Sequence, residues 1–285
     1  MTTLYECAPA KINLTLDILG RRPDGFHDLE TVMQALKLCD EVEVDVQTGR
    51  EWSLSCETEG VPCDSRNLAW KAAALFEQKS GTDLGGVAIR IVKRIPSQAG
   101  MGGGRADAAA VLRALNRFCG EPYTLWELAD LGAEIGSDVP FCVVNGTCMC
   151  RGRGERMRPL RPMPFCQIVV AKPDFGLSTP ALFRQIDEMQ IEKHPDNAAM
   201  EQALEEGNLQ KIAAGLSNMF DGAVSRDHPE IDDIREILAS SGALGQQMTG
   251  SGSAFFGIMP DAASAERAAA RLRRSYPFVF ITEPA

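Results

Sequence analysis

Residues 95–110 read Ile95-Pro96-Ser97-Gln98-Ala99-Gly100-Met101-Gly102-Gly103-Gly104-Arg105-Ala106-Asp107-Ala108-Ala109-Ala110. Glycine occupies four of the five positions from Gly100 to Gly104, which lets the backbone approach a bulky anion and adopt positive φ angles. A β-like run ends at Ile95, and we expect a helix to begin near Ala106, with its unpaired N–H groups and positive dipole end directed into the loop. The stretch predicts an anion site, such as one for the phosphates of a nucleotide. A tight strand-to-helix turn without a ligand is the alternative.

Two common nucleotide-binding patterns are absent from this loop. No Lys-Ser or Lys-Thr follows the glycines, so the P-loop pattern fails. Arg105 stands where the last glycine of G-x-G-x-x-G belongs, so the dinucleotide pattern fails as well. If the loop binds phosphate, it is therefore predicted to be a phosphate-binding loop of another class.

Composition limits the class of protein. A length of 285 residues favours two domains. A net charge of −10 and a pI near 4.9 argue against a nucleic-acid or membrane-surface partner. The chain has no 18-residue apolar run and no signal-peptide pattern at its start, so a cytoplasmic protein is expected. The nine cysteines include no C-x-x-C pair and the three histidines no H-E-x-x-H, which predicts reduced thiols and no metal site of the protein's own.

The hydrophobic patterning predicts an α+β protein in two halves. Prolines 159, 162 and 164 mark a linker, which gives domains at 1–160 and 161–285. Strands are expected at 11–18, 42–46, 52–56, 87–92, 165–171 and 278–281, with 42–46 and 52–56 as antiparallel neighbours. Helices are expected at 68–78, 106–118 and 125–135, after Ser178, and near 198–206, 208–219, 230–240 and 262–274.

Several polar side chains have two interpretations. Lys11 and Asn13 share one face of the first strand and could form a solvated surface or line a cleft. Asp138 lies in the turn 136–140, a position typical of an active-site carboxylate and, more often, of a helix N-cap. Phe26 and His27 follow a turn and could be packing residues or ligands. The residues alone leave these alternatives open.

Five motifs together indicate a family. Pro9–Leu14, Pro96–Ala110 and Met248–Phe255 resemble the three signature motifs of the GHMP small-molecule kinases. Gly20–His27 and Ile135–Phe141 are similar to motifs of the branch that phosphorylates a cytidyl-methylerythritol in the non-mevalonate isoprenoid pathway. The resemblance implies an N-terminal ribosomal-protein-S5-like domain and a C-terminal α/β-sandwich GHMP domain, with the active site in the cleft between them.

The resemblance also implies an activity: transfer of the ATP γ-phosphoryl group to a hydroxyl, which gives a 2-phosphate and ADP. Asp138 matches the family's catalytic aspartate and Lys11 the lysine that stabilises the reacting groups. Mg²⁺ is expected with the ATP, carried by the nucleotide. The ATP-binding positions implied are Asn67, Pro96, Ser97, Gln98, Ala99, Gly100, Met101, Gly102, Gly103, Gly104, Arg105 and Ala106.

For the second substrate, a cytidyl diphosphate sugar alcohol, the resemblance implies Asn13, Phe26, His27, Thr179 and Phe183. Phe26 and Phe183 would sandwich the base, and His27 would read its edge by hydrogen bonds. A monomer or weak homodimer is expected. The alternatives are a GHMP kinase of the homoserine or mevalonate type, and a non-catalytic nucleotide-binding module.

One position departs from the family pattern. The family commonly has two serines after the loop glycines, where this chain has Arg105 and Ala106. A cation at a helix N-terminus opposes the helix dipole, at a cost of roughly 0.3–1 kcal/mol. We expect bound phosphate to compensate through a contact with Arg105. The alternative is that Arg105 points into solvent.

Overall fold

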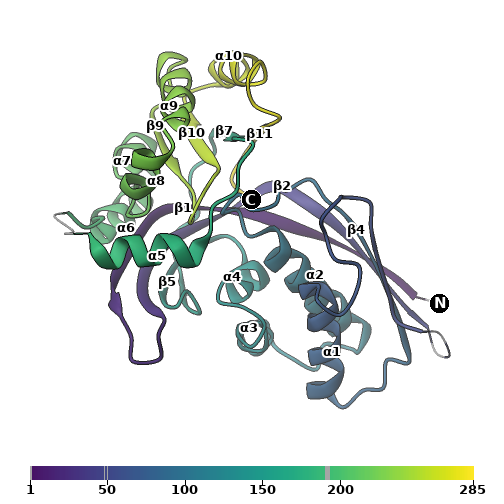
Figure 1. Cartoon of the computed structure of the whole chain (residues 1–285). Coiled ribbons are helices and arrows are strands. Elements are labelled where there is room, and N and C mark those ends of the chain that lie inside the picture. The colour runs from purple at the N-terminus through teal and green to yellow at the C-terminus, as the bar shows by residue number, and fades with distance from the viewer. Residues whose placement is uncertain (1, 48, 50, 190–192) are drawn as a thin grey trace. The chain divides into compact units, whose positions relative to one another are not determined.

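The computed structural model describes residues 2–47, 49, 51–189 and 193–285. The chain divides into two compact units: unit 1 comprises Met1–Ala10, Cys39–Ile95 and Gly102–Asn145, and unit 2 comprises Lys11–Leu38, Pro96–Met101 and Gly146–Ala285. Two long strands, β1 (Thr2–Arg21) and β2 (His27–Gln47), contribute residues to both units (Figure 1). The compact units therefore do not follow a single boundary at residue 160. The domain division 1–160 and 161–285 stays a prediction.

Unit 1 contains the edge of a sheet. β3 (Ser53–Cys56) runs parallel to β4 (Gly86–Val92), and β4 pairs antiparallel with residues 41–47 of β2. The predicted pairing of 42–46 with 52–56 is wrong, because β4 lies between them. β4 buries Val87, Ile89 and Ile91, whereas β3 buries only Leu54. The more apolar strand takes the inner position, which alternation alone does not reveal.

Four helices complete unit 1. α1 (Leu68–Ser80) packs against α2 (Gly103–Phe118), and α3 (Leu125–Ala133) packs against α4 (Val139–Val144), as Figure 1 shows. The predicted capping box of α3 is present, with Thr124 Oγ1 accepting from the Glu127 N–H. α2 begins three residues before the predicted Ala106, because Gly102 takes the N-cap position with a φ of 77°. The last two loop glycines thus already lie in its first turn.

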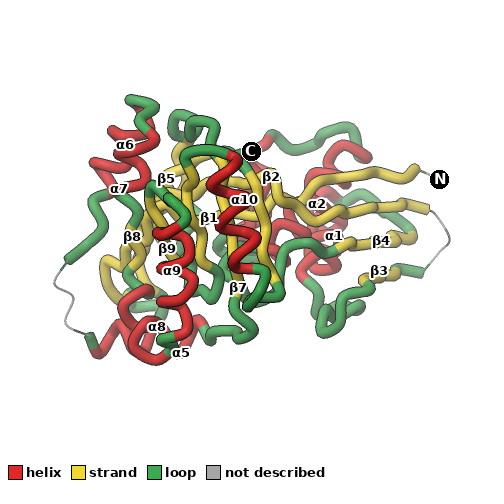
Figure 2. The backbone as a smooth tube through the Cα atoms, turned by 90° about the horizontal axis from the view of Figure 1, so that it is seen from above, coloured by secondary structure: helices red, strands yellow, loops and turns green. Residues whose placement is uncertain are grey.

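The core of unit 2 is built on an antiparallel sheet. Its strand order is β11 (Phe278–Thr282), β7 (Gln167–Lys172), β10 (Phe255–Met259) and β9 (Gly245–Met248). α9 (Glu230–Ser240) and α10 (Ala262–Leu272) cover one face of this sheet (Figure 2). Val169 and Phe255 of the sheet pack with Leu238 of α9 and Ala268 of α10, all of them buried.

The other elements of unit 2 are short. They are β5 (Thr147–Gly152), β6 (Arg156–Pro159), α5 (Thr179–Glu188), α6 (Asn197–Glu205), α7 (Leu209–Ala214), β8 (Ser217–Asn218) and α8 (Asp221–Asp227). The helix predicted over 208–219 ends at Ala214, and Ser217 pairs with Thr15 of β1 instead. The patterning also missed β5, β6, β8, β9, β10, α4 and α8. Each spans seven residues or fewer, too short for a helical or strand period to stand out.

β1 is buried on both faces from Lys11 to Ile18. Ile12 and Leu14 are buried, as the alternation predicts, but Lys11, Asn13 and Asp17 on the opposite face are buried as well. The interpretation of Lys11 and Asn13 as a solvated surface is therefore wrong. Buried charged and amide side chains require hydrogen-bond partners, and these partners build the site.

Candidate functional site

The predicted phosphate loop is divided between the units. Pro96–Met101 belongs to unit 2, and Gly102–Ala106 belongs to unit 1. Lys11, Asn13, Phe26, His27, Thr179 and Phe183 lie in unit 2, whereas Asn67 and Asp138 lie in unit 1.

In unit 2, Lys11 is held by a buried hydrogen-bond cluster. Lys11 is only 3% exposed. Its Nζ donates a hydrogen bond to Asn13 Oδ1 at 2.5 Å. Asn13 Nδ2 donates in turn to Thr31 Oγ1 at 2.8 Å, and the Asn13 backbone N–H donates to Thr249 Oγ1 at 3.1 Å. The amide of Asn13 therefore orients the Lys11 ammonium. Thr31 and Thr249 were not predicted as site residues, although Thr249 lies in the third quoted motif.

The first half of the phosphate loop packs against the loop 249–253. The Ala254 N–H donates to the Ala99 carbonyl at 3.2 Å, and the Lys11 N–H donates to the Met101 carbonyl at 3.0 Å. Gly100 has a φ of 72°, and a Cβ there would overlap the Thr249 carbonyl oxygen. Only glycine fits such a close approach. Lys11 Nζ lies 3.2 Å from the position of a Cβ at Gly250, so its ammonium is directly against this second glycine loop.

The aromatic residues of the predicted base site are arranged differently from the expected sandwich. His27 stacks on Phe183, with ring centroids 4.4 Å apart and planes at 13°, and His27 Nε2 bonds Asp187 Oδ1 at 2.8 Å. Phe26 is 53% exposed, and the Arg153 guanidinium lies over its ring at 5.0 Å. The structure thus brings His27 and Phe183 together and places a cation on Phe26. No motif had pointed to Asp187.

Thr179 is the first residue of α5 and is exposed. Its Oγ1 lies 2.6 Å from Ser251 Oγ, in the second glycine loop. The two hydroxyls thus link the start of α5 to the loop 249–253, which packs against Gly100. The predicted role of Thr179 in substrate binding stays a prediction.

In unit 1, the start of α2 presents backbone donors. The Arg105 and Ala106 N–H groups both donate to the Gly102 carbonyl at 2.9 Å, and Gly102 has no side chain to cap the helix. The N–H groups of Gly103 and Gly104 lie in the first turn, where α-helical N–H groups lack intrahelical acceptors. Such a helix start suits an anion.

Arg105 and Asp138 lie near the same turn. Arg105 is exposed, and its Cγ is 4.0 Å from the position of a Cβ at Gly136. Asp138 occupies the N-cap position of α4, yet its side chain makes no capping hydrogen bond. The interpretation of Asp138 as a capping residue is therefore wrong. Its half-buried carboxylate is not used by its own helix.

A buried charge cluster lies against the second half of the loop. Lys93 Nζ bonds Asp107 Oδ2 at 2.7 Å and also pairs with Asp40, and it lies 3.2 Å from the position of a Cβ at Gly103. Asp40 Oδ1 accepts from the N–H groups of Arg94 and Ile95, at 2.5 and 2.8 Å. No sequence motif had indicated Asp40, and Asp107, although it lies within the motif Pro96–Ala110, was not predicted as a site residue.

The pKa values of Asp107 and Lys93 in this cluster are both raised, for different reasons. It raises the pKa of Asp107 to about 7, because a buried carboxylate loses hydration. Burial opposes the charge on Lys93, but the carboxylates of Asp107 and Asp40 outweigh it and raise the pKa of Lys93. Asp107 Oδ1 is buried without a hydrogen-bond partner. The charged form of Asp107 is therefore stabilised by fewer hydrogen bonds than that of Asp40.

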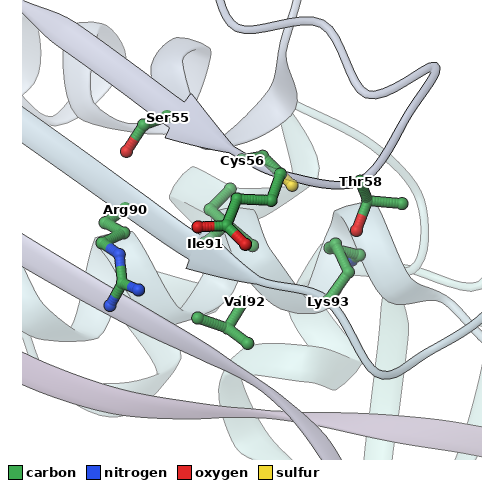
Figure 3. A pocket seen from close by; sticks show the side chains of 8 residues that line it. Ser55, Cys56, Thr58, Arg90, Ile91, Val92 and Lys93 are labelled. Carbon is green, nitrogen blue, oxygen red and sulfur yellow. The ribbon is translucent and has the colours of Figure 1, made fainter.

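A cavity of about 200 Å³ opens at the carboxyl ends of the parallel strands β3 and β4 (Figure 3). Cys56 and Thr58 line it from one strand end, and Arg90, Val92 and Lys93 from the other. The cavity thus reaches the lysine that abuts Gly103.

Asn67, predicted to bind ATP, caps α1 through the Ala69 N–H and donates to the Pro62 carbonyl at 2.8 Å. Its amide organises the loop that precedes α1.

Within 2–47, 49, 51–189 and 193–285, no group of three or more His, Cys, Asp or Glu side chains could hold a metal ion. No helix in these ranges is both long and apolar enough to cross a membrane.

Comparison with known proteins gives consistent matches along the chain. Residues 67–146 match the family model of the GHMP kinases N terminal domain and residues 200–277 that of the GHMP kinases C terminal domain. These matches lie on either side of residue 160. The fold is shared with the solved structure of a homoserine kinase from Cytophaga hutchinsonii, which is 16% identical with a TM-score of 0.77 and covers 100% of this chain and 95% of that one. It is also shared with the structure of an L. major mevalonate kinase, which is 17% identical with a TM-score of 0.77 and covers 99% of this chain and 96% of that one. The chain is a GHMP kinase in fold and sequence.

More similar proteins narrow the class. A 4-diphosphocytidyl-2-C-methyl-D-erythritol kinase from Caldicellulosiruptor saccharolyticus is 42% identical over 276 residues, which cover 97% of this chain and 93% of the relative. One from Bacillus licheniformis is 44% identical, covering 90% and 88%. A crystal structure of 4-(cytidine 5'-diphospho)-2C-methyl-D-erythritol kinase superposes with a TM-score of 0.83 at 33% identity, covering 99% and 100%. This chain belongs to the 4-diphosphocytidyl-2-C-methyl-D-erythritol kinase family.

Proposed function

We propose that this protein transfers the γ-phosphoryl group of ATP to a hydroxyl of the methylerythritol moiety of 4-diphosphocytidyl-2-C-methyl-D-erythritol, giving the 2-phosphate and ADP. The observation that carries the proposal is the similarity to kinases of that name, at 42% identity over 97% of the chain. The predicted cytoplasmic location and the predicted state as a monomer or weak homodimer remain expectations.

The glycine loop is the proposed triphosphate site. The uncapped start of α2 offers the N–H groups of Gly103 and Gly104, and the helix dipole favours negative charge there. Mg²⁺ would arrive with the nucleotide, held by phosphate oxygens and water. The cavity beside Lys93 lies next to this helix start and is the proposed position of the adenosine end.

Asp138 and Lys11 are the proposed catalytic pair. Asp138 would accept the proton of the attacking hydroxyl, as its carboxylate is not occupied by capping. Lys11 would stabilise the negative charge of the transferring phosphoryl group. The hydrogen bond from Lys11 Nζ to Asn13 Oδ1 fixes the ammonium before substrate arrives, and a preorganised charge needs no rearrangement during the reaction.

Phe26, His27 and Phe183 are the proposed cytosine site, with Asn13 and Thr179 nearby in the same unit. The face of Phe183 that stacks on His27 cannot also stack on a base while that contact lasts. Phe26 is half exposed and carries the Arg153 guanidinium at its ring, an arrangement that suits a stacked base followed by a diphosphate. Cytosine would therefore stack on Phe26 first. His27 would then rotate away from Phe183, so that the Phe183 ring could stack on the other face of the base.

The experiment is a measurement of ADP release with Mg·ATP and one of three alcohols: the cytidyl substrate, homoserine or mevalonate. We expect turnover with the cytidyl substrate alone. Asp138→Asn should lower kcat by about 10²–10⁴-fold, the usual contribution of a general base, while ATP binding measured by calorimetry stays within twofold. Turnover with homoserine or mevalonate would overturn the proposed substrate. ATP binding without any turnover would favour a non-catalytic nucleotide-binding module.

A further inference from the structure

Two cysteine thiols outside the proposed site lie in contact. Cys39 Sγ donates to Cys7 Sγ at 3.2 Å, and both residues belong to unit 1. Cys7 lies on β1 and Cys39 on β2, which are neighbours in the sheet. A disulfide requires an S–S distance of about 2.0 Å and side chains directed at one another. Small rotations of the two side chains would close the remaining gap.

The two thiols differ in their surroundings. Cys7 is exposed and Cys39 is half-buried. Burial, reinforced by the hydrogen bond with Cys7, raises the pKa of Cys39 to about 11. The Cys39 S–H donates to the Cys7 sulfur, so the two sulfurs already face each other. Cys7 is thus placed to react first with a reagent in solution, and Cys39 is placed to attack second.

We propose that Cys7 and Cys39 form a reversible disulfide on exposure to a small-molecule disulfide. The Cys7 thiolate attacks one sulfur of the reagent, which breaks the reagent's S–S bond and releases one small thiolate. Cys39 then gives up its proton and attacks the Cys7 sulfur of the mixed disulfide, and the second small thiolate leaves. The two cysteine sulfurs are oxidised, the two reagent sulfurs are reduced, and two protons pass to the released thiolates.

The bond would form next to residues that support the phosphate loop. Cys39 directly precedes Asp40, whose carboxylate accepts from the Arg94 and Ile95 N–H groups and pairs with Lys93. A shift of Cys39 toward Cys7 would therefore act on the end of β4.

A second connection starts from Cys7. Its carbonyl accepts from Arg113 Nη2 at 2.7 Å, and Arg113 Nη1 donates to the Cys142 carbonyl of α4 at 2.6 Å. Both contacts lie within unit 1. They give the disulfide a direct link to the helix that begins after Asp138.

The other cysteines provide the comparison. Cys142, Cys148, Cys150 and Cys166 are buried, which protects them from a reagent in solution. Cys63 is exposed like Cys7, but its Sγ lies near the carbonyl oxygens of Cys56 and Val61, each at 3.7 Å, rather than near a thiol. Cys63→Ser is therefore the matched control for Cys7→Ser.

The test is incubation of the folded protein with glutathione disulfide, followed by non-reducing digestion and mass spectrometry. We expect a peptide pair linking Cys7 to Cys39, two hydrogen atoms lighter than the free peptides and released by dithiothreitol. Cys63→Ser should give the same pair in the same yield. Cys7→Ser and Cys39→Ser should each lose it, and Cys39→Ser should stop at the mixed disulfide on Cys7.

Stable glutathionylation of wild-type Cys7 without a link to Cys39 would overturn the proposal, as would a link between any other two cysteines in greater yield. Failure of Cys39→Ser to fold would leave the Cys7→Ser comparison intact. Because the readout is a mass and not turnover, the outcome is independent of the proposed kinase activity.

Discussion

The guanidinium of Arg105 lies at the third residue of α2, exposed and next to the turn that contains Asp138. A cation there opposes the helix dipole unless an anion compensates it. We predict that Arg105→Ser raises the KM for ATP by about three- to tenfold, because a charge-assisted hydrogen bond to phosphate contributes roughly 1.5–3 kcal/mol before solvent screening. Initial rates at saturating second substrate measure this value.

Arg274→Ser is the matched control for this substitution. Arg274 is an exposed arginine in unit 2, just beyond α10, so its loss changes the net charge equally without touching the loop. An unchanged KM for ATP in Arg105→Ser would show that Arg105 points into solvent. An equal rise in both variants would assign the effect to overall charge.

Asp107 gives a second prediction at the scale of one residue, in the pH dependence of stability. Its pKa is about 7 in the folded protein, above the 3.8 of an ordinary aspartate. The folded state therefore binds more protons than the unfolded state between these values, and stability falls as pH rises through that window. Asp107→Asn removes this titration and can still accept from Lys93. We predict that its stability relative to wild type rises between pH 5 and pH 8 by on the order of 2 kcal/mol, at about 1.4 kcal/mol per pKa unit.

Urea denaturation of both proteins at pH 5, 6.5 and 8 measures this difference. A stability difference that is constant with pH would show that Asp107 is ionised throughout this range.

Among the elements, the contact of Gly100 with the loop 249–253 leaves no room for a side chain at residue 100. A side chain there would combine a φ of 72° with overlap of the Thr249 carbonyl. We predict that Gly100→Ala lowers the free energy of unfolding by more than about 2 kcal/mol and weakens ATP binding. Gly222→Ala is the matched control. A Cβ at Gly222 in α8 meets nothing within 4 Å, so this change should stabilise by up to about 1 kcal/mol. Equal unfolding midpoints for both variants would contradict the predicted packing.

The sequence predicts elements well where the chain carries local signals. Asn67 and the Thr124–Glu127 capping box locate the starts of α1 and α3, because both caps are satisfied by residues within three positions. The start of α2 was misplaced because glycines 103 and 104 have poor helix propensity, and tertiary packing overrides it. β3 and β4 were recognised, but their order in the sheet depends on non-local burial.

The candidate site was predictable only in part, for the same reason. The family resemblance led to the prediction of Lys11, Asn13 and Asp138 as site residues, because its motifs are matched residue by residue along the chain. The long-range contacts around the predicted residues were not predictable. Asn13 reaches Thr249 across 236 positions of sequence, and Asp40 binds the backbone of Ile95 across 55. Such pairs leave no periodic trace in the chain, because only the tertiary fold brings them together.

At the scale of the whole molecule, the two units are joined by strands rather than by a linker. The division falls between Ala10 and Lys11 inside β1 and between Leu38 and Cys39 inside β2. A strand that loses its partners in one unit cannot keep its register at the boundary of the other. The units should therefore unfold together, although each has its own helices.

The tryptophans make this cooperativity measurable, because Trp52, Trp70 and Trp126 all lie in unit 1. Leu238→Ala removes a fully buried side chain from the core of unit 2, which typically costs about 2–5 kcal/mol. We predict that it lowers the urea midpoint of tryptophan fluorescence as much as that of far-ultraviolet circular dichroism. A fluorescence midpoint that stays at the wild-type value, with an earlier transition in circular dichroism, would show that unit 1 folds without unit 2.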